Sequence, residues 1–235
     1  MAVTVRRLGL LGGMSWESSI EYERVINRFV RRHRGGVSSA DLIIRSFDFA
    51  DVEALQEVGD WEGAAELLCA AARELESVGA QAIVICTNTM HRVAEEVQAA
   101  VMVPVIHIAD ATARAVCAAG LGVVALLGTR YTMEQDFYAD RLREHGLDVM
   151  VPDEPDRSMI HDVIYDELVR GEIRDESRRR YVQAIETLQQ RGAEAVITGC
   201  TEIELLIGPD DIDLPFFPTA RIHAEEAARF ALGTD

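Results

Sequence analysis

The stretch that decides the fold is Gly79-Ala80-Gln81-Ala82-Ile83-Val84-Ile85-Cys86-Thr87-Asn88-Thr89. Its pattern returns later in the chain as Gly192-Ala193-Glu194-Ala195-Val196-Ile197-Thr198-Gly199-Cys200-Thr201-Glu202. The two copies align without a gap at an offset of 113 residues, from Gly79 to Gly192. Each copy is a short apolar strand that ends in small hydroxyl, thiol or amide side chains. The alignment places Thr87 opposite Cys200.

A second match supports an internal duplication. Leu10-Leu11-Gly12 recurs as Leu126-Leu127-Gly128 at an offset of 116 residues, close to the first offset. Two matches with nearly the same spacing indicate a repeated unit more strongly than either match alone. We therefore expect two similar lobes that aim equivalent strand ends, with one reactive group each, at the two faces of a small molecule.

Short apolar runs predict four strands in each half of the chain: 8–11, 42–47, 82–86, 103–108, 122–127, 147–151, 195–198 and 214–217. Helical periodicity separates most of them, for example over Trp61–Val78 and Asp175–Arg191. Gly79 and Gly192 follow these two helices, where a left-handed residue is favoured. Strands that alternate with helices indicate parallel sheets covered on both faces.

The predicted fold class is α/β, with two pseudosymmetric lobes related by a pseudo-twofold axis. Each lobe is a four-stranded parallel sheet flanked by helices, and the active site is expected in the cleft between the lobes. We expect residues 1–102 and 215–235 to form the first lobe and residues 103–214 the second.

Composition narrows the class of partner. The hydrophobic content of 49% and charged content of 27% are ordinary for a globular protein. A net charge of −17 argues against nucleic acid or an anionic membrane surface, because both require a basic patch. The N-terminal stretch lacks the pattern of a signal peptide, so none is expected, and no later run is expected to span a bilayer. Four cysteines without paired spacing predict free thiols and a cytoplasmic location, and Cys69 and Cys117 are expected to be small core residues.

The candidate functional residues lie at the carboxyl ends of the predicted strands. Ligands of parallel α/β sheets bind beyond the carboxyl ends of the strands, and the segments there are Gly12-Gly13-Met14-Ser15, Ser46-Phe47-Asp48, Thr87-Asn88-Thr89, Thr129 and Cys200-Thr201-Glu202. All except the second precede a predicted helix, so their polar side chains are equally suited to be plain N-caps. Helix N-termini would also let this acidic chain bind a carboxylate through backbone N–H groups.

At these residues the chain resembles the aspartate/glutamate racemase family, which works without pyridoxal phosphate. The matching segments are Gly9-Leu10-Leu11-Gly12-Gly13-Met14-Ser15-Trp16-Glu17-Ser18, Cys86-Thr87-Asn88-Thr89-Met90-His91, Leu126-Leu127-Gly128-Thr129-Arg130-Tyr131-Thr132-Met133 and Gly199-Cys200-Thr201-Glu202-Ile203. The resemblance implies two pseudosymmetric lobes, a homodimer, and inversion of an amino acid α-carbon by two opposed cysteine bases.

One position departs from the pattern of the family. Cys200 matches the second-lobe cysteine, but the first-lobe Cys-Asn-Thr motif reads Thr87-Asn88-Thr89 here, with Cys86 one residue earlier. The internal alignment independently pairs Thr87 with Cys200. Because side chains alternate along a strand, Cys86 should point away from the face that Thr87 uses and be a buried structural thiol. The chain thus resembles an atypical Thr/Cys subgroup.

This departure predicts unequal catalytic roles. Cys200, with its pKa lowered at a helix N-terminus, is expected to be the base, and Thr87 a weaker proton donor or relay. Asn88, Thr89 and Thr201 would stabilise the enolate. Glu202 and Asp48 are expected to tune these groups, unless they are ordinary surface acids. The predicted substrate-binding residues are Gly13, Met14, Ser46, Asp48, Asn88, Thr89, Thr129, Thr201 and Glu202, with Met14 as a wall of the pocket and His91 as a capping residue.

Two rival functions remain open at this level. A single thiol in the same fold would suit a decarboxylase of a small dicarboxylate, and a two-lobe cleft would suit an amino acid sensor. No cofactor or metal is expected, because no lysine lies near the motifs and they lack metal-ligand spacing. The substrate side chain is not identified; Arg45, Arg130 and His161 are the candidate partners for a carboxylate on it.

Overall fold

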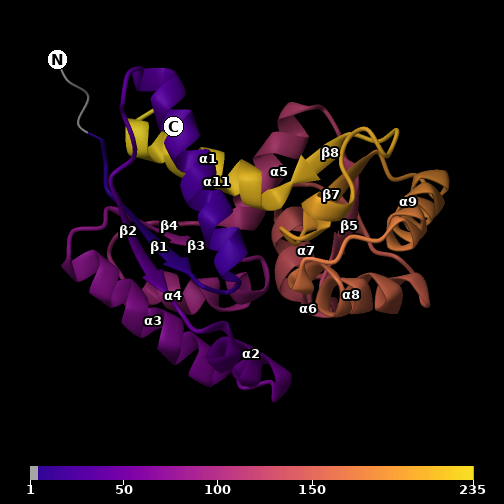
Figure 1. Cartoon of the computed structure of the whole chain (residues 1–235), viewed down its shortest axis with the longest axis horizontal. Coiled ribbons are helices and arrows are strands. Elements are labelled where there is room, and N and C mark those ends of the chain that lie inside the picture. The colour runs from indigo at the N-terminus through magenta and orange to yellow at the C-terminus, as the bar shows by residue number, and fades with distance from the viewer. Residues whose placement is uncertain (1–4, 235) are drawn as a thin grey trace. The chain divides into compact units, whose positions relative to one another are not determined.

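The structure is a computed structural model that describes residues 5–234. Its described residues divide into two compact units (Figure 1). The first contains the chain up to His107 and again from His223 onward, and the second contains Ile108–Ile222. Each unit is built around its own four-stranded sheet.

The first unit follows a strand–helix alternation, as its sequence predicts. Its elements are β1 (Leu8–Gly12), α1 (Trp16–Arg34), β2 (Leu42–Ser46), α2 (Phe49–Glu57), α3 (Trp61–Ser77), β3 (Ala82–Ile85), the 3₁₀ helix η1 (Thr89–Val93), α4 (Ala94–Ala100) and β4 (Val105–Ile106). The sheet has the order β2-β1-β3-β4, and every pairing in it is parallel.

The second unit repeats this plan. Its elements are α5 (Ile108–Ala118), β5 (Val123–Gly128), α6 (Arg130–Glu134), α7 (Asp136–Glu144), β6 (Asp148–Met150), α8 (Asp156–Asp166), η2 (Leu168–Arg170), α9 (Asp175–Gln190), β7 (Ala195–Gly199), α10 (Ile203–Leu206) and β8 (Phe216–Pro218), followed by α11 (Thr219–Leu232), which continues into the first unit. The sheet order is β6-β5-β7-β8, again all parallel.

The two sheets share one register. Leu10 of β1 pairs with Val84 of β3, and Leu126 of β5 pairs with Ile197 of β7. These are the pairs that the two sequence offsets make equivalent. The prediction of two four-stranded parallel α/β sheets flanked by helices is therefore confirmed, and so are all eight strands, with bounds shifted by a few residues.

The boundaries of the compact units lie later in the chain than the predicted breaks after residues 102 and 214. β4 completes the first sheet by pairing with β3, and β8 completes the second by pairing with β7. A strand belongs to the sheet that satisfies its backbone hydrogen bonds, so each edge strand stays with the unit that precedes it. Apolar periodicity alone does not reveal this choice.

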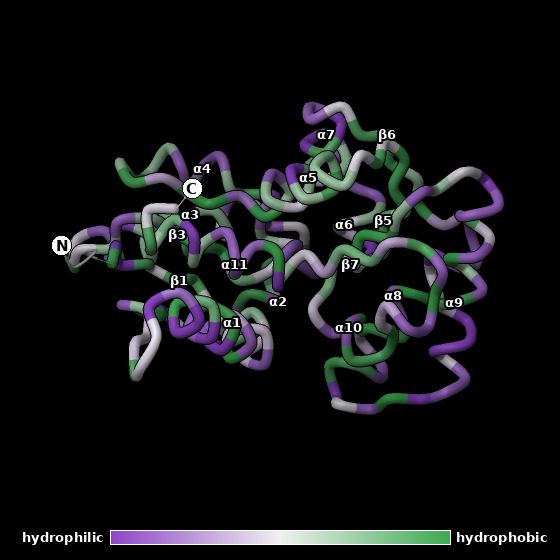
Figure 2. Tube along the Cα trace, turned by 90° about the horizontal axis from the view of Figure 1, so that it is seen from above, coloured by the Kyte–Doolittle hydropathy of each residue, from purple (hydrophilic) through white to green (hydrophobic). Residues whose placement is uncertain are grey.

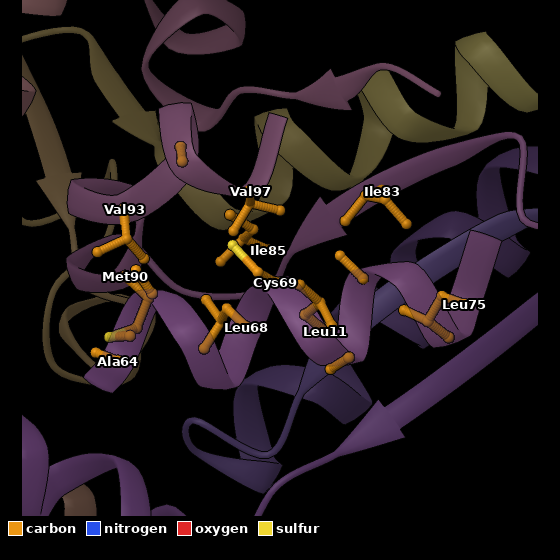
Figure 3. Packing of buried hydrophobic residues seen from close by; sticks show 14 of the residues in the cluster. Leu11, Ala64, Leu68, Cys69, Leu75, Ile83, Ile85, Met90, Val93 and Val97 are labelled. Carbon is orange, nitrogen blue, oxygen red and sulfur yellow. The ribbon is translucent and has the colours of Figure 1, made fainter. Parts of the chain in front are cut away.

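Helices bury one face each against these sheets. In α1 the buried residues recur at helical spacing, from Tyr22 through Ile26 to Phe29 and Val30, and its coils alternate between hydrophilic and hydrophobic colours in Figure 2. Figure 3 shows side chains of α3, η1 and α4 gathered around Ile83 and Ile85 of β3. The sheet edge that carries the site thus rests on a closely packed core.

Among the described residues, no helix combines the length and the apolar character that a membrane crossing requires.

Candidate active site

In the first unit, three strands end at the same edge of the sheet. Gly12 pairs with Ser46 and Leu11 pairs with Ile85. Beyond these pairs, the Phe47 N–H donates to the Gly12 carbonyl at 3.0 Å, and the Cys86 N–H donates to the Leu11 carbonyl at 2.9 Å. The predicted segments around Gly13, Ser46 and Thr87 therefore lie together at one carboxyl edge.

The loop after β1 requires glycine. Gly13 has a φ of +84°, and a Cβ built there would lie 2.3 Å from both the backbone N and O of Phe47. No other residue fits such an approach without moving the backbone. Gly13 thus holds the first loop against the loop that follows β2, where Ser46 is exposed.

Met14 and Asp48 lie in contrasting surroundings. Met14 is only 5% exposed and belongs to the core cluster with Phe47. The segment at Asp48 was not expected to precede a helix, but Asp48 is the exposed N-cap of α2, and its Oδ1 accepts the Ala50 N–H at 3.1 Å. An Asp two residues before an unbonded N–H is a local signal for such a cap.

Thr87 and Cys86 occupy contrasting environments. Thr87 is partly exposed, and its N–H donates to the Ile85 carbonyl at 2.9 Å. Cys86 is 1% exposed, with Sγ 3.8 Å from the Val84 carbonyl oxygen. Burial raises the pKa of the Cys86 thiol far above its usual range. The alternation argument predicted this burial, and Cys86 holds its proton at neutral pH.

The residues after Thr87 enter η1 directly. Asn88 and Thr89 are buried, at 3% and 7% exposure. The Asn88 carbonyl accepts the His91 N–H at 3.0 Å. His91, also buried, donates from Nδ1 to the Thr87 carbonyl at 2.7 Å, since a carbonyl oxygen can only accept. His91 therefore does cap a carbonyl at the end of the strand.

The second unit has an equivalent edge. Gly128 of β5 pairs with Gly199 of β7. Thr129 and Cys200, the residues that follow these two glycines, therefore lie at the same sheet edge. Thr129 is 6% exposed, and its Oγ1 lies 3.3 Å from Oγ1 of Thr132. The structure thus gathers Thr129, Cys200, Thr201 and Glu202 at this edge, as the sequence predicts.

Cys200 and Glu202 form a hydrogen-bonded pair. The Cys200 Sγ–H donates to Oε2 of Glu202 at 2.9 Å; the thiol is partly exposed and the carboxyl is 8% exposed. Burial first, and then the negative charge of Glu202, raise the pKa of Cys200 well above its usual value. Burial and Glu202 thus act against the lowering of the Cys200 pKa that was expected from a helix N-terminus, here that of the four-residue α10 (Ile203–Leu206).

The three candidate partners for a substrate carboxylate belong to both units. Arg45 of β2, in the first unit, is exposed, donates to the Ser46 carbonyl at 2.8 Å and lies over the ring of Phe47. In the second unit, the exposed Arg130 donates its backbone N–H to Nδ1 of His161 at 3.2 Å. Burial, and then the charge of Arg130, lower the pKa of His161. Each unit therefore has one of the candidate arginines near its strand ends.

A cluster of aromatic and imidazole side chains behind Thr87 was missed by the sequence analysis. Three histidine rings and a tyrosine meet there, contributed by four distant segments: Tyr22, His91, His107 and His223. No local spacing connects residues so far apart in sequence, and the tertiary fold alone brings them together.

Among residues 5–234, no group of three or more His, Cys, Asp or Glu side chains is arranged to hold a metal ion.

Comparison with known proteins assigns the family. The profile of the Asp/Glu/Hydantoin racemase family matches residues 11–227. A candidate Asp/Glu racemase from Yersinia pestis has a crystal structure that is 49% identical, with a TM-score of 0.93 over 97% of this chain and 99% of that one. An aspartate racemase homologue from Pyrococcus horikoshii OT3 is 34% identical, with a TM-score of 0.85 over 96% of this chain and 99% of that one.

A curated relative is more distant. The broad specificity amino-acid racemase RacX of Bacillus subtilis (strain 168) is 24% identical over 151 residues, which are 63% of this chain and 63% of that protein. The match with the family profile covers most of the chain. The chain therefore belongs to the Asp/Glu/Hydantoin racemase family, a family of isomerases.

Proposed function

We propose that this member of the Asp/Glu/Hydantoin racemase family inverts the α-carbon of an amino acid, namely aspartate, glutamate or a similar small polar one. Racemisation is the reaction that names the family, and the two similar solved structures are described as a candidate Asp/Glu racemase and an aspartate racemase homologue. These descriptions favour racemisation over the decarboxylase and sensor alternatives.

The observation that carries the mechanism is the Cys200–Glu202 hydrogen bond at a strand end equivalent to that of Thr87. In the proposed step, the Cys200 proton moves to Glu202, and the resulting thiolate removes the α-proton of the substrate. The electrons of the Cα–H bond pass into the carboxylate as an enolate. Thr87 then donates its hydroxyl proton, directly or through water, to the opposite face of Cα; the Thr87 oxygen regains a proton from water and Glu202 returns its proton to water, which restores the starting state.

The protonation states of Cys200 and Thr87 at rest predict unequal rates for the two directions of racemisation. Cys200 holds its proton until Glu202 accepts it, whereas Thr87 has a hydroxyl that is a far weaker acid than a thiol. The two enantiomers of the substrate meet different first bases, so their turnover should differ. We therefore propose that the chain belongs to an atypical Thr/Cys subgroup of the family. Backbone N–H groups and hydroxyls of Asn88, Thr89 and Thr201 would stabilise the enolate.

A panel of L- and D-amino acids in D₂O tests this proposal. We expect α-deuterium incorporation for aspartate or glutamate by NMR, with the opposite enantiomer detected by chiral chromatography. Release of CO₂ from a malonate-type acid without α-exchange of any amino acid would instead favour the decarboxylase. Arg45→Ala and Arg130→Ala variants, compared on acidic and neutral substrates, would identify the arginine that binds a side-chain carboxylate.

Three further expectations belong to the same proposal: independence from metal ions and pyridoxal phosphate, a homodimer, and a cytoplasmic location. The residues present give no lysine at the strand ends for a Schiff base. Dialysis against a chelator should leave activity intact, and added pyridoxal phosphate should not increase it. Light scattering should report twice the chain mass of 26.0 kDa.

A further inference from the structure

We propose that His91 is a positioning residue for Thr87: its imidazole fixes the Thr87 carbonyl, and through the backbone it sets the direction of the Thr87 hydroxyl. This inference rests on the proposed role of Thr87 and extends it to a buried histidine cluster defined by Tyr22, His91, His107 and His223. Neither the composition of the motif nor its spacing indicates such a role.

The first step of the argument concerns the Thr87 backbone. Its N–H donates to the Ile85 carbonyl at 2.9 Å, and its carbonyl accepts His91 Nδ1–H at 2.7 Å. With both peptide groups bonded, φ and ψ of Thr87 are held from both sides. The Cα–Cβ direction follows from these angles, and a Thr side chain has few χ1 choices. The bond from His91 therefore limits where Oγ1 can point.

The second step concerns the His91 ring itself. It is 3% exposed, and its centroid lies 4.7 Å from that of His107 and 5.4 Å from that of His223, in edge-to-face geometry. Burial, followed by His107 and His223, lowers the pKa of His91 well below its usual value, although the hydrogen bond to the Thr87 carbonyl acts in the opposite direction. At neutral pH the ring is neutral, with its proton on the nitrogen that faces Thr87.

The third step concerns the support behind His91. His223 Nε2 lies 2.6 Å from the Ile106 carbonyl and donates to it, and its Nδ1 lies 2.8 Å from the Tyr22 hydroxyl oxygen. These two contacts fix the orientation of the His223 ring. Because Tyr22 lies on α1 and His223 on α11, two helices and the end of β4 hold the surface against which His91 packs.

Two histidines of the cluster lie where the chain leaves and re-enters the first unit. His107 is the last residue of the first unit before the chain leaves it, and His223 is the first residue after the chain returns. Both histidines contact the ring that holds Thr87. The position of the Thr87 carbonyl is therefore tied to the two segments that lead to and from the unit that carries Cys200.

Two substitutions separate the hydrogen bond from the packing. The amide nitrogen of Asn occupies the position of Nδ1, whereas that of Gln occupies the position of Nε2. His91→Gln should lower kcat about 10- to 100-fold, a range typical of a misplaced catalytic group, with KM changed less than about threefold. His91→Asn should recover most of that loss, because it can donate to the Thr87 carbonyl. Melting temperatures of both variants report any loss of folding.

The matched control is His33 of α1. Its Nδ1 also donates to a carbonyl four residues earlier, that of Phe29, at 2.9 Å, but the residue is exposed and far in sequence from every strand end. His33→Gln should leave kcat and KM unchanged.

A double-mutant comparison decides the route of the effect. If His91 acts through Thr87, His91→Gln should cause no additional loss in a Thr87→Ala background. An equal loss in both backgrounds, or His91→Asn as slow as His91→Gln, would overturn the positioning role. The proposed function fails separately: it does so if Thr87→Ala keeps the full rate of the unmodified enzyme, or if that enzyme exchanges no α-proton.

Discussion

The strand ends at Thr87 and Cys200 have equivalent backbone positions, but their side chains have different chemical surroundings. β3 and β7 hold the same place in sheets of the same order, and their neighbours pair in the same register. After β3 comes a hydroxyl whose carbonyl is held by a buried, neutral imidazole; after β7 comes a thiol whose proton is held by a carboxylate. The two units thus give Thr87 and Cys200 equivalent places but different hydrogen-bond partners.

This difference shows why two equivalent positions need not be equivalent catalysts. A reactive group takes its acidity from its partners, and these come from other elements or from the next turn of the chain. Glu202 lies two residues from Cys200 and His91 lies four residues from Thr87, but His107 and His223 come from the segments where the chain leaves and re-enters the first unit. Substituting one residue at a time tests how much each contributes to the difference between the two strand ends.

The largest effect is expected from Cys200→Ser. A serine hydroxyl at this position cannot carry the charge of a thiolate near neutral pH, so turnover in both directions should fall by ~10³-fold, within the range for loss of a general base. Chiral chromatography of L- and D-substrate measures it. An active Cys200→Ser variant would mean that the carboxylate of Glu202, rather than the thiol, removes the proton.

Glu202→Gln should have the next largest effect. It removes the negative charge and the acceptor that raise the pKa of Cys200, so the pKa should fall. Alkylation of Cys200 by iodoacetamide, located by peptide mass spectrometry because Cys117 is exposed, should then begin at lower pH. Turnover should fall about tenfold or more, since the thiol loses its proton acceptor.

Glu204→Gln is the matched control for that prediction. Glu204 also raises the pKa of Cys200, but it is the smallest of the contributions. The alkylation profile of this variant should shift in the same direction by less than that of Glu202→Gln. Equal shifts would show that total charge, and not the hydrogen bond at 2.9 Å, governs the thiol.

Thr87→Cys makes the two strand ends alike in side chain. It should bring the L-to-D and D-to-L turnover rates closer together, because each face of the substrate then meets a thiol. The expected change in their ratio is several-fold, about 1 kcal/mol in relative barrier height. Initial rates with each pure enantiomer give the ratio, and Thr87→Ser, which keeps a hydroxyl, should leave the asymmetry in place.

Cys86→Ala should change turnover least. The side chain is 1% exposed, so its loss leaves a small cavity that lowers the free energy of unfolding by about 1–2 kcal/mol. Denaturant titration measures this cost. If α-proton exchange disappears in Cys86→Ala but persists in Thr87→Ala, Cys86 is the first-lobe base and the register argument is wrong.

The same variant has a signature in alkaline solution. The folded-state pKa of Cys86 is raised above its usual 9.0, so the folded protein binds this proton more tightly than the unfolded chain does. The resulting stability is complete below pH 9.0 and declines as the pH rises above it. The stability difference between the unmodified protein and Cys86→Ala should therefore shrink above that pH.

Much of the site was predictable because it is built locally. The residues Thr87, Asn88, Cys200 and Glu202 follow strands whose apolar runs are visible in the sequence, and parallel pairing brings strand ends to one edge. The burial of Met14 could not be predicted, because a residue after a strand can turn into the core as easily as toward the surface. The helix after Asp48 was missed because its apolar pattern is weak and only two of its residues are buried.

The sequence by itself determined the internal duplication, the α/β alternation, the shared register and the equivalence of Thr87 and Cys200 in the alignment. Each of these follows from local patterns or from a comparison of the two repeats. The tertiary structure decided which sheet takes each edge strand, that Cys200 rests as a thiol, and that Tyr22, His107 and His223 surround His91. Hydrogen-bond partners and pKa values depend on distances and burial among segments far apart in the chain. A linear pattern does not contain those distances.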